Sequence, residues 1–252
     1  MRRPSSTATI IAVALCAYVT DDLIHEVCGH GVASFLTPGV RALSLSSVAL
    51  QTSSPSRFVA AAGSIANVLA GIAALLLARR RRGFDATRYF LLLLGALDLL
   101  NGTGYLLFSG VLGIGDWAAV VRGFEPAFAW RAGLCVVGAA TYAGSMLIIA
   151  HEFTRTEVAP GEMPSLILPA YVSGGLLMVA AAAMNPIDPM LILTSGASAG
   201  FGAMAGLLGV PALAARRPPS GEATLARSVP WMIAGAAAGL FFVFVVGRGI
   251  KL

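Results

Sequence analysis

The 252-residue chain is too apolar for an ordinary soluble protein, because 57% of its residues are hydrophobic and only 12% are charged, against about 25% charged in soluble domains. This composition excludes a soluble enzyme and predicts an integral, multi-pass membrane protein whose surroundings are the lipid bilayer. The formal net charge of +5 does not indicate nucleic-acid binding, because the basic residues gather at the ends of apolar segments, where membrane anchors belong.

Seven apolar stretches approach the roughly 20 residues that a membrane-spanning helix needs. They cover residues 8–34, 57–78, 87–111, 128–150, 166–184, 190–213 and 229–247. The expected fold is therefore all-α, a polytopic bundle of transmembrane helices with six or seven spans. The count depends on residues 185–189, which form either an external turn or a break inside a re-entrant hairpin.

The basic residues favour one orientation in the membrane. The largest basic run, residues 79–82, directly follows the second apolar segment. By the positive-inside rule this side should be cytoplasmic, and so should the N-terminus, which begins on the same side. Other basic residues expected on that side are Arg2, Arg3, Arg216, Arg217 and Arg227. Those expected on the other side are Arg41, Arg57, Arg122, Arg248 and Lys251.

The end of the first apolar segment carries an ionisable cluster, the stretch His25-Glu26-Val27-Cys28-Gly29-His30. Two of the three histidines of the chain lie here and flank a carboxylate. Ionisable side chains at membrane depth are costly, and they mark functional sites by default. Two neutral imidazoles can bind zinc, and a glutamate can activate a water molecule. We therefore expect a zinc site in this segment.

The spacing of the two histidines is one residue longer than in the H-E-x-x-H pattern of zinc proteases. His25 and His30 stand at positions i and i+5, about 140° apart on a regular α-helix. A one-residue π-bulge restores a common face, because its wider turn aligns i with i+5. Gly29 tolerates such a backbone adjustment. The metal-site hypothesis thus requires a π-bulge within the motif.

A catalytic zinc site needs a third protein ligand and an open position for water. Asp116 is the candidate, because it follows the third apolar segment and so emerges on the same membrane face as the end of the first. Asp98, inside the third segment, is the competing candidate. Asp21 and Asp22 lie one turn before His25, where they would either orient an imidazole by hydrogen bonding or line a polar cavity.

Three segments, in order, resemble the motifs of the site-2 protease family, which are membrane-embedded zinc metalloproteases. The stretch from His25 to His30 resembles that family's H-E-x-G-H core with one residue inserted. Residues 62–67 (Ala-Gly-Ser-Ile-Ala-Asn) are similar to its A-G-P-x-x-N segment, with serine in place of proline. The stretch from Asn101 to Asp116 is similar to its third motif, an asparagine followed by an aspartate beside a glycine.

This resemblance implies an intramembrane zinc metalloendopeptidase. Its zinc ion would be bound by His25, His30 and Asp116. Glu26 would be the catalytic general base that activates water. The substrate would be a peptide bond of a membrane protein or a membrane-associated peptide.

The resemblance covers residues 20–120, so it also implies a division of the chain. Residues 1–126 would form the metalloprotease-like core, with three spans and the Asp116 loop. Residues 127–252 would add transmembrane helices of unassigned role. Within the core, Asn67 or Asn101 would help to hold the substrate backbone or an oxyanion.

A transporter, or a pathway for ions or protons, is the main alternative. Carboxylates and histidines inside membranes form such pathways. The residues available for one are Asp21, Asp22, His25, Glu26 and Asp98. A non-catalytic scaffold is a third reading, but it leaves the dense motif unexplained. Glu26 discriminates between these readings, because a protease should lose activity with Glu26→Gln while keeping its metal.

Overall fold

The computed structural model describes residues 5–186, 190, 192–215 and 223–252 of the chain. Within this part, seven helices are long and apolar enough to cross a membrane. They are Thr7–Leu36, Arg57–Arg80, Ala86–Leu112, Ala127–Thr154, Met163–Ala183, Thr194–Ala214 and Val229–Val246. The predicted all-α bundle of transmembrane helices is thereby confirmed, with seven spans. Of the predicted turn or break at 185–189, residues 187–189 lie outside the described residues.

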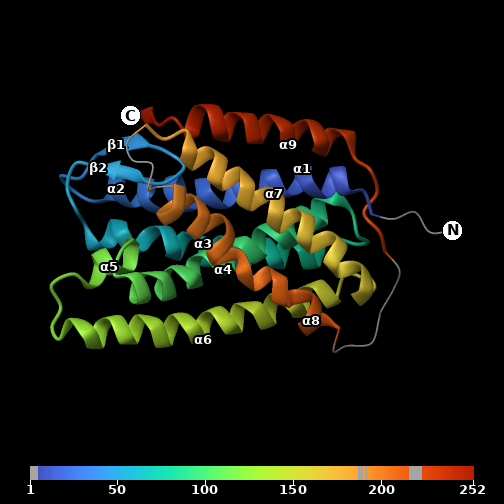
Figure 1. Cartoon of the computed structure of the whole chain (residues 1–252), viewed down its shortest axis with the longest axis horizontal. Coiled ribbons are helices and arrows are strands. Elements are labelled where there is room, and N and C mark those ends of the chain that lie inside the picture. Colours follow the sequence, from blue (N-terminus) through green and yellow to red (C-terminus); the bar gives the residue numbers. More distant parts are fainter. Residues whose placement is uncertain (1–4, 187–189, 191, 216–222) are drawn as a thin grey trace.

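Several of the spans are built from more than one element (Figure 1). In chain order, the elements are α1 (Thr7–Leu23), η1 (Ile24–Gly31), α2 (Val32–Leu36), β1 (Ala42–Leu45), β2 (Leu50–Thr52), α3 (Arg57–Arg80), α4 (Ala86–Leu112), α5 (Asp116–Val121), α6 (Ala127–Thr154), η2 (Pro160–Glu162), α7 (Met163–Ala183), η3 (Ile192–Gly202), η4 (Ala203–Gly209), α8 (Val210–Ala214), α9 (Val229–Phe241), η5 (Phe242–Val246) and β3 (Ile250–Lys251).

Polar side chains at the helix ends set where the spans begin and stop. Ser6, Ser56 and Asp85 each accept a hydrogen bond from a backbone N–H three residues further on, at the start of α1, α3 and α4. Such caps satisfy amides that a helix leaves unpaired at its N-terminus. Gly113 adopts a left-handed conformation with φ of 71° and ends α4. The chain can then turn sharply into α5.

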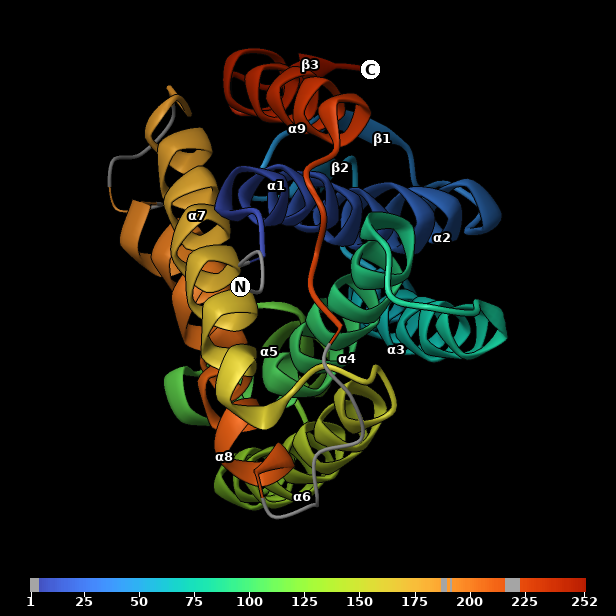
Figure 2. The same ribbon diagram turned by 90° about the vertical axis from the view of Figure 1, so that its right-hand side faces the viewer.

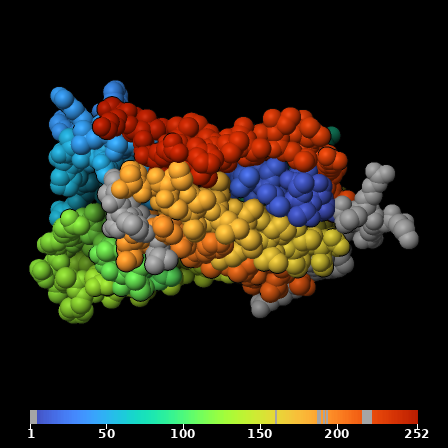
Figure 3. All heavy atoms as spheres, turned by 45° about the horizontal axis from the view of Figure 1, so that its top comes forward, coloured from blue at the N-terminus to red at the C-terminus, as the bar shows by residue number. Residues whose placement is uncertain are grey.

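The helix α4 lies at the centre of the bundle. It packs against α1, α3 and α6, and it is the most buried of the spans, whereas α6 and α9 are the least buried. Figure 2, which looks along the bundle, shows α4 between α3 and α6. Figure 3 shows α9 and α7 lying on either side of α1. The first and third spans, which carry most of the predicted site residues, are therefore packed against several of the other spans.

A small antiparallel sheet, which the sequence analysis did not predict, lies at the end of the bundle where the first span finishes (Figure 1). Its strand order is β2-β1-β3. Leu45 of β1 pairs with Leu50 of β2 on one side and with Ile250 of β3 on the other. The sheet thus joins the loop after the first span to the segment after the seventh.

An ion pair joins α3 to α6 at the opposite end of the bundle. Arg79 donates two hydrogen bonds to the carboxylate of Glu152, from Nε at 2.9 Å and from Nη2 at 2.7 Å. The Glu152 side chain is buried. Burying a carboxylate without a partner is costly, so this two-point contact with an arginine stabilises the arrangement of the second and fourth spans.

Candidate metal centre

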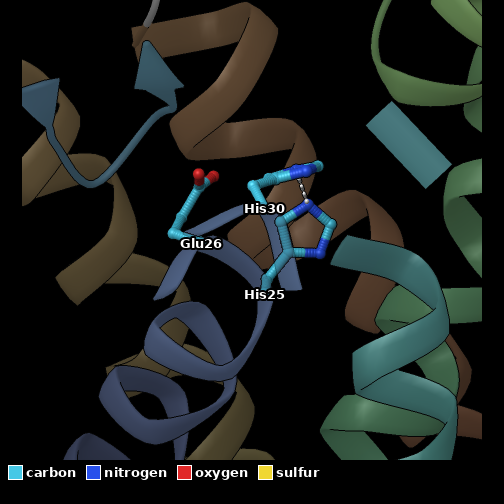
Figure 4. A group of neighbouring side chains, drawn as sticks. All are labelled: His25, Glu26 and His30. Carbon is cyan, nitrogen blue, oxygen red and sulfur yellow. Dashed lines mark hydrogen bonds between the residues drawn. The ribbon is translucent and has the colours of Figure 1, made fainter. Parts of the chain in front are cut away.

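The histidine motif lies on a π-helical turn, η1, inserted between α1 and α2. At its end, the backbone N–H of Val32 contacts the carbonyl of Val27, five residues earlier. The wider turn brings both imidazoles to one side (Figure 4), with their Nε2 atoms 3.1 Å apart. The predicted π-bulge is thereby confirmed. On a regular α-helix the same two side chains would diverge.

Two glycines allow η1 and α3 to approach closely. A Cβ atom added to Gly29 would stand 2.5 Å from the Cα of Gly63. A Cβ atom added to Gly63 would stand 2.6 Å from Nε2 of His25 and 2.7 Å from Nε2 of His30. None of these three distances is sterically possible, so only glycine fits at these two positions. The backbone of Gly63 thus lies directly against both imidazoles.

Hydrogen bonds orient the two imidazole rings. Nδ1 of His30 lies 2.7 Å from the carbonyl oxygen of Val59, and Nδ1 of His25 lies 2.6 Å from Oδ1 of Asn67. Both partners are acceptors, so each Nδ1 must carry the ring proton as the donor. In a neutral imidazole the other nitrogen, Nε2, then presents a lone pair. The two lone pairs face each other.

The amide of Asn67 has only one favourable orientation. Its Nδ2 group donates to Oδ1 of Asp98 at 2.7 Å and to Oδ1 of Asp21 at 3.0 Å. A reversed amide would place its oxygen against these carboxyl oxygens. Oδ1 of Asn67 therefore faces His25, which fixes the tautomer of that ring. Asn67 thus lies behind His25, with both ends of its amide engaged.

Asp116 completes a group of three converging ligand atoms. Its Oδ2 lies 3.1 Å from Nε2 of His25 and 3.3 Å from Nε2 of His30. It is the first residue of α5, directly after Gly115, whose φ of 83° turns the chain toward the histidines. Burial alone would raise the pKa of the Asp116 carboxyl, but hydrogen bonds and positive charge from His25 and His30, when these rings are protonated, hold that pKa well below its usual range.

Three electron-pair donors at these distances need a proton or a metal ion between them. Tetrahedral bonds of about 2.0–2.1 Å from zinc would separate donor atoms by about 3.3 Å. The three separations here are 3.1, 3.1 and 3.3 Å. The donor set and its spacing therefore fit a metal ion of this size.

Glu26 lies beside the imidazoles (Figure 4) and is held by the sheet. Its Oε2 accepts a hydrogen bond from the backbone N–H of Leu50, in β2, at 2.6 Å. The ligand atoms of His25, Glu26 and His30 lie within 4.8 Å of one another, and all three side chains are buried. These three residues form a group that could hold a metal ion.

The competing aspartates occupy a layer behind the histidines. Asp98 is fully buried and contacts Asn67, not the histidines. Asp21 accepts hydrogen bonds from Asn67 at 3.0 Å and from Asn101 at 3.0 Å, and its carboxyl group also contacts that of Asp98. Asp116, rather than Asp98, thus lies next to His25 and His30. Asn67, rather than Asp21 or Asp22, contacts the imidazole of His25.

Three groups at the site were not predicted from the sequence. The ring of Tyr105 stacks on His25, with the ring centroids 4.9 Å apart. The other two groups are backbone atoms, the Val59 carbonyl and the Leu50 amide. Alternating apolar and polar residues at 43–46 (Leu-Ser-Leu-Ser) are a signal for the strand β1, but the residues around Leu50 do not alternate. Nothing in the sequence signals the partner of a backbone atom.

A cavity of about 580 Å³ opens beside the site. Its wall includes His25, Glu26 and Tyr105 from the first and third spans. The opposite wall comes from the second half of the chain, with residues of α6, α7, η3 and η4. The later helices therefore complete the space next to the group of His25, Glu26 and His30.

The fold and the site define a multi-pass membrane protein with a buried His-Glu-His group that could hold a metal ion. Comparisons of the chain with protein-family models, with curated proteins and with solved structures give no match.

Proposed function

We propose that the chain is an intramembrane zinc peptidase that hydrolyses a peptide bond in or near a membrane segment of its substrate. One observation carries the proposal, the convergence of His25 Nε2, His30 Nε2 and Asp116 Oδ2 to 3.1–3.3 Å beside a buried glutamate. Two histidines and one carboxylate, with a fourth position open, are a frequent ligand set of catalytic zinc.

The same three ligands would also suit ferrous iron in an oxygenase. Glu26 favours zinc, because hydrolysis needs a general base close to the metal and oxygen activation does not. Bound zinc would supply the Lewis acidity that polarises a carbonyl and lowers the pKa of a water molecule to about 7.

The residues of the chain have separate roles in this mechanism. Glu26 accepts a proton from the attacking water and returns it to the leaving amine. The Leu50 amide holds one oxygen of that carboxylate, which fixes the direction of the other. Asn67 and the Val59 carbonyl hold the imidazoles in the tautomer that ligation requires. The scissile bond would approach from the cavity, which Glu26 and His25 line.

The proposal includes an orientation with the N-terminus in the cytoplasm. The basic run at Arg79–Arg82 lies at the end of the bundle opposite the sheet, and Arg88 and Arg155 lie at that same end. Following the positive-inside rule, we assign this end to the cytoplasm. The metal-binding group, in the second half of the first span, would then lie toward the external face.

Metal content and proteolysis test the proposal together. We expect about one zinc per wild-type chain by elemental analysis in detergent, and almost none in His30→Ala. Glu26→Gln should keep its zinc but cleave none of a panel of fluorogenic transmembrane peptides that the wild type cleaves. His151→Ala is the matched control, because this third histidine lies near the far end of α6, and it should keep both properties. Wild-type protein that stays metal-free after zinc is supplied would contradict the proposal.

A proton or ion pathway is the second candidate function, and the buried acidic layer favours it. Asp21 and Asp98 are in carboxyl–carboxyl contact, and Asn67 connects them to His25. Chains of this kind carry protons in membrane transporters. Proteoliposomes containing the metal-free protein should then dissipate a pH gradient, and Asp98→Asn should abolish that leak. A peptidase of the proposed kind would leave the gradient intact.

A further inference from the structure

The cavity beside the metal-binding group is rich in carboxyl groups. Asp21, Asp22 and Glu26 all line it. Among the described residues that line the cavity, none is a lysine or an arginine. Much of the remaining wall is apolar or weakly polar, with methionine, leucine and phenylalanine side chains. A negative group in such surroundings is costly unless a cation accompanies it.

Asp22 is the carboxylate that lacks a partner. Asp21 is hydrogen bonded by Asn67 and Asn101, and Glu26 by the Leu50 amide. Oδ2 of Asp22 is buried without any hydrogen bond, and the residue is only 8% exposed. Asp98 has a similar unpaired oxygen, but Asp98 does not line the cavity and already contacts Asp21.

Two further unpaired polar atoms belong to residues of the same wall. The Tyr18 hydroxyl and Oδ1 of Asn101 are buried without hydrogen-bond partners, and both residues line the cavity. Tyr18, Asp22 and Glu26 follow one another at intervals of four residues, so they form a stripe along one side of the first span. Native structures leave few buried polar groups unsatisfied. Three such acceptors in one cavity wall, one of them a carboxylate, indicate a ligand with several donors.

We infer that Tyr18, Asp22 and Asn101 form a subsite for a protonated amine of the substrate. An ammonium group carries three N–H donors and one positive charge, which match three acceptors, one of which is the Asp22 carboxylate. The amine would be a lysine side chain or a free N-terminal amino group, and the apolar wall would take the hydrophobic residues beside it. That the amine belongs to a substrate rests on the proposed peptidase function. The subsite itself depends only on the residues that line the cavity.

Binding without cleavage tests the subsite. The probes are three fluorescent peptides of leucine and alanine in non-ionic detergent. The first has an acetylated N-terminus and a central lysine, and the second has an acetylated N-terminus and norleucine in place of the lysine. The third contains norleucine and has a free N-terminus. Fluorescence anisotropy at neutral pH measures their binding to the zinc-loaded Glu26→Gln protein. At least one amine-bearing peptide should bind at least tenfold more tightly than the acetylated norleucine peptide. Comparison of the two amine-bearing peptides identifies the source of the amine.

Variants separate a specific subsite from general negative charge. In the same Glu26→Gln background, Asp22→Asn should abolish the preference for the amine, and Asp22→Glu should retain most of it. Tyr18→Phe, which removes only the hydroxyl, should reduce the preference several-fold. Glu125→Gln is the matched control, because it removes one negative charge from an exposed residue that does not line the cavity. It should leave the preference unchanged.

Equal binding of all three peptides would overturn the inference, and so would an amine preference that survives Asp22→Asn. The first result would mean that water alone satisfies these polar atoms. Because the measurement needs no turnover, an amine preference in a protein whose wild type cleaves nothing would refute the peptidase and keep the subsite. Cleavage by the wild type without any amine preference would refute the subsite and keep the peptidase.

Discussion

At the scale of single residues, the site depends as much on missing side chains as on reactive ones. Gly63 takes part in no chemistry, yet its Cα hydrogens face the two nitrogen atoms that would ligate a metal. Gly29 lets η1 lie against the backbone of α3 at that point. A larger residue at either position must move the helices apart or displace the imidazoles, because both are held by hydrogen bonds on their other side.

We predict that Gly63→Ala strongly weakens metal binding. The added methyl group would stand 2.6–2.7 Å from both Nε2 atoms, so the rings must rotate out of their common geometry. Disturbing groups that position metal ligands typically costs about 10–100-fold in affinity. Competition with a zinc chelator measures this loss in purified protein.

The matched control for this prediction is Gly144→Ala. Gly144 is also in the interior of a spanning helix, α6, but a Cβ atom there meets nothing within 4 Å. Both substitutions gain similarly in helix propensity, so a difference in zinc affinity reports on the site. If Gly63→Ala bound zinc as tightly as Gly144→Ala, the arrangement of η1 against α3 would be incorrect.

At the scale of elements, the small sheet connects distant parts of the chain to the glutamate. β2 supplies the amide that holds Glu26, β1 pairs with β2, and β3 pairs with β1. A further hydrogen bond runs from the N–H of Leu252 to the carbonyl of Leu43. Two- and three-residue strands have little stability of their own. The position of β2 therefore depends on the whole sheet.

We predict that deleting residues 250–252 slows peptide cleavage by about tenfold or more while zinc binding is kept. The deletion removes the strand that flanks β1, and displacement of a catalytic group by as little as 1 Å can cost about 100-fold in rate. Steady-state cleavage and zinc content of the same preparation measure the two effects. Ile250→Val, which keeps the strand and its backbone pairing, should cleave at nearly the wild-type rate. Loss of zinc together with activity would mean that the sheet positions the metal ligands and not Glu26.

The sequence predicts the helical elements much better than the sheet. Spans are readable because about 20 apolar residues in a row have few other interpretations. The π-turn was predictable because His25 and His30 can share a face only if the helix widens. The sheet was missed because its strands are short and because β1 pairs with a segment from the far end of the chain. For the same reason, the Leu50 amide has no sequence signal, although the residue that it holds, Glu26, stands out.

At the scale of the whole molecule, the two halves of the chain share one cavity. No motif in residues 127–252 indicates chemistry, so the role of this half cannot be predicted from its sequence. In the structure, Tyr142, Met178 and Met204 from this half line the cavity opposite Asp22 and Glu26. A membrane span also requires apolar residues, so the sequence cannot distinguish residues that line a cavity from residues that only cross the membrane. The second half thus bounds the space in which a substrate would lie.

The membrane orientation decides from which side that cavity is reached. The sheet and the loop before α5 lie at one end of the bundle, and the arginine run after α3 lies at the other (Figure 1). With the arginine end in the cytoplasm, the Asp116 loop and the cavity residues Val111 and Leu112 face the exterior. Zinc and water would then reach the site from outside the cell.

Cysteine labelling in intact cells tests this orientation. In a background where Cys16, Cys28 and Cys135 are replaced by alanine, we expect Ser53→Cys, in the exposed loop after β2, to react with a membrane-impermeant maleimide. Arg82→Cys, exposed at the other end, should react only after the cells are opened. One span, α3, separates these two positions and places them on opposite faces, so exactly one of them should be labelled from outside. Labelling of Arg82→Cys alone would reverse the orientation, and the site would then draw zinc and substrate from the cytoplasm.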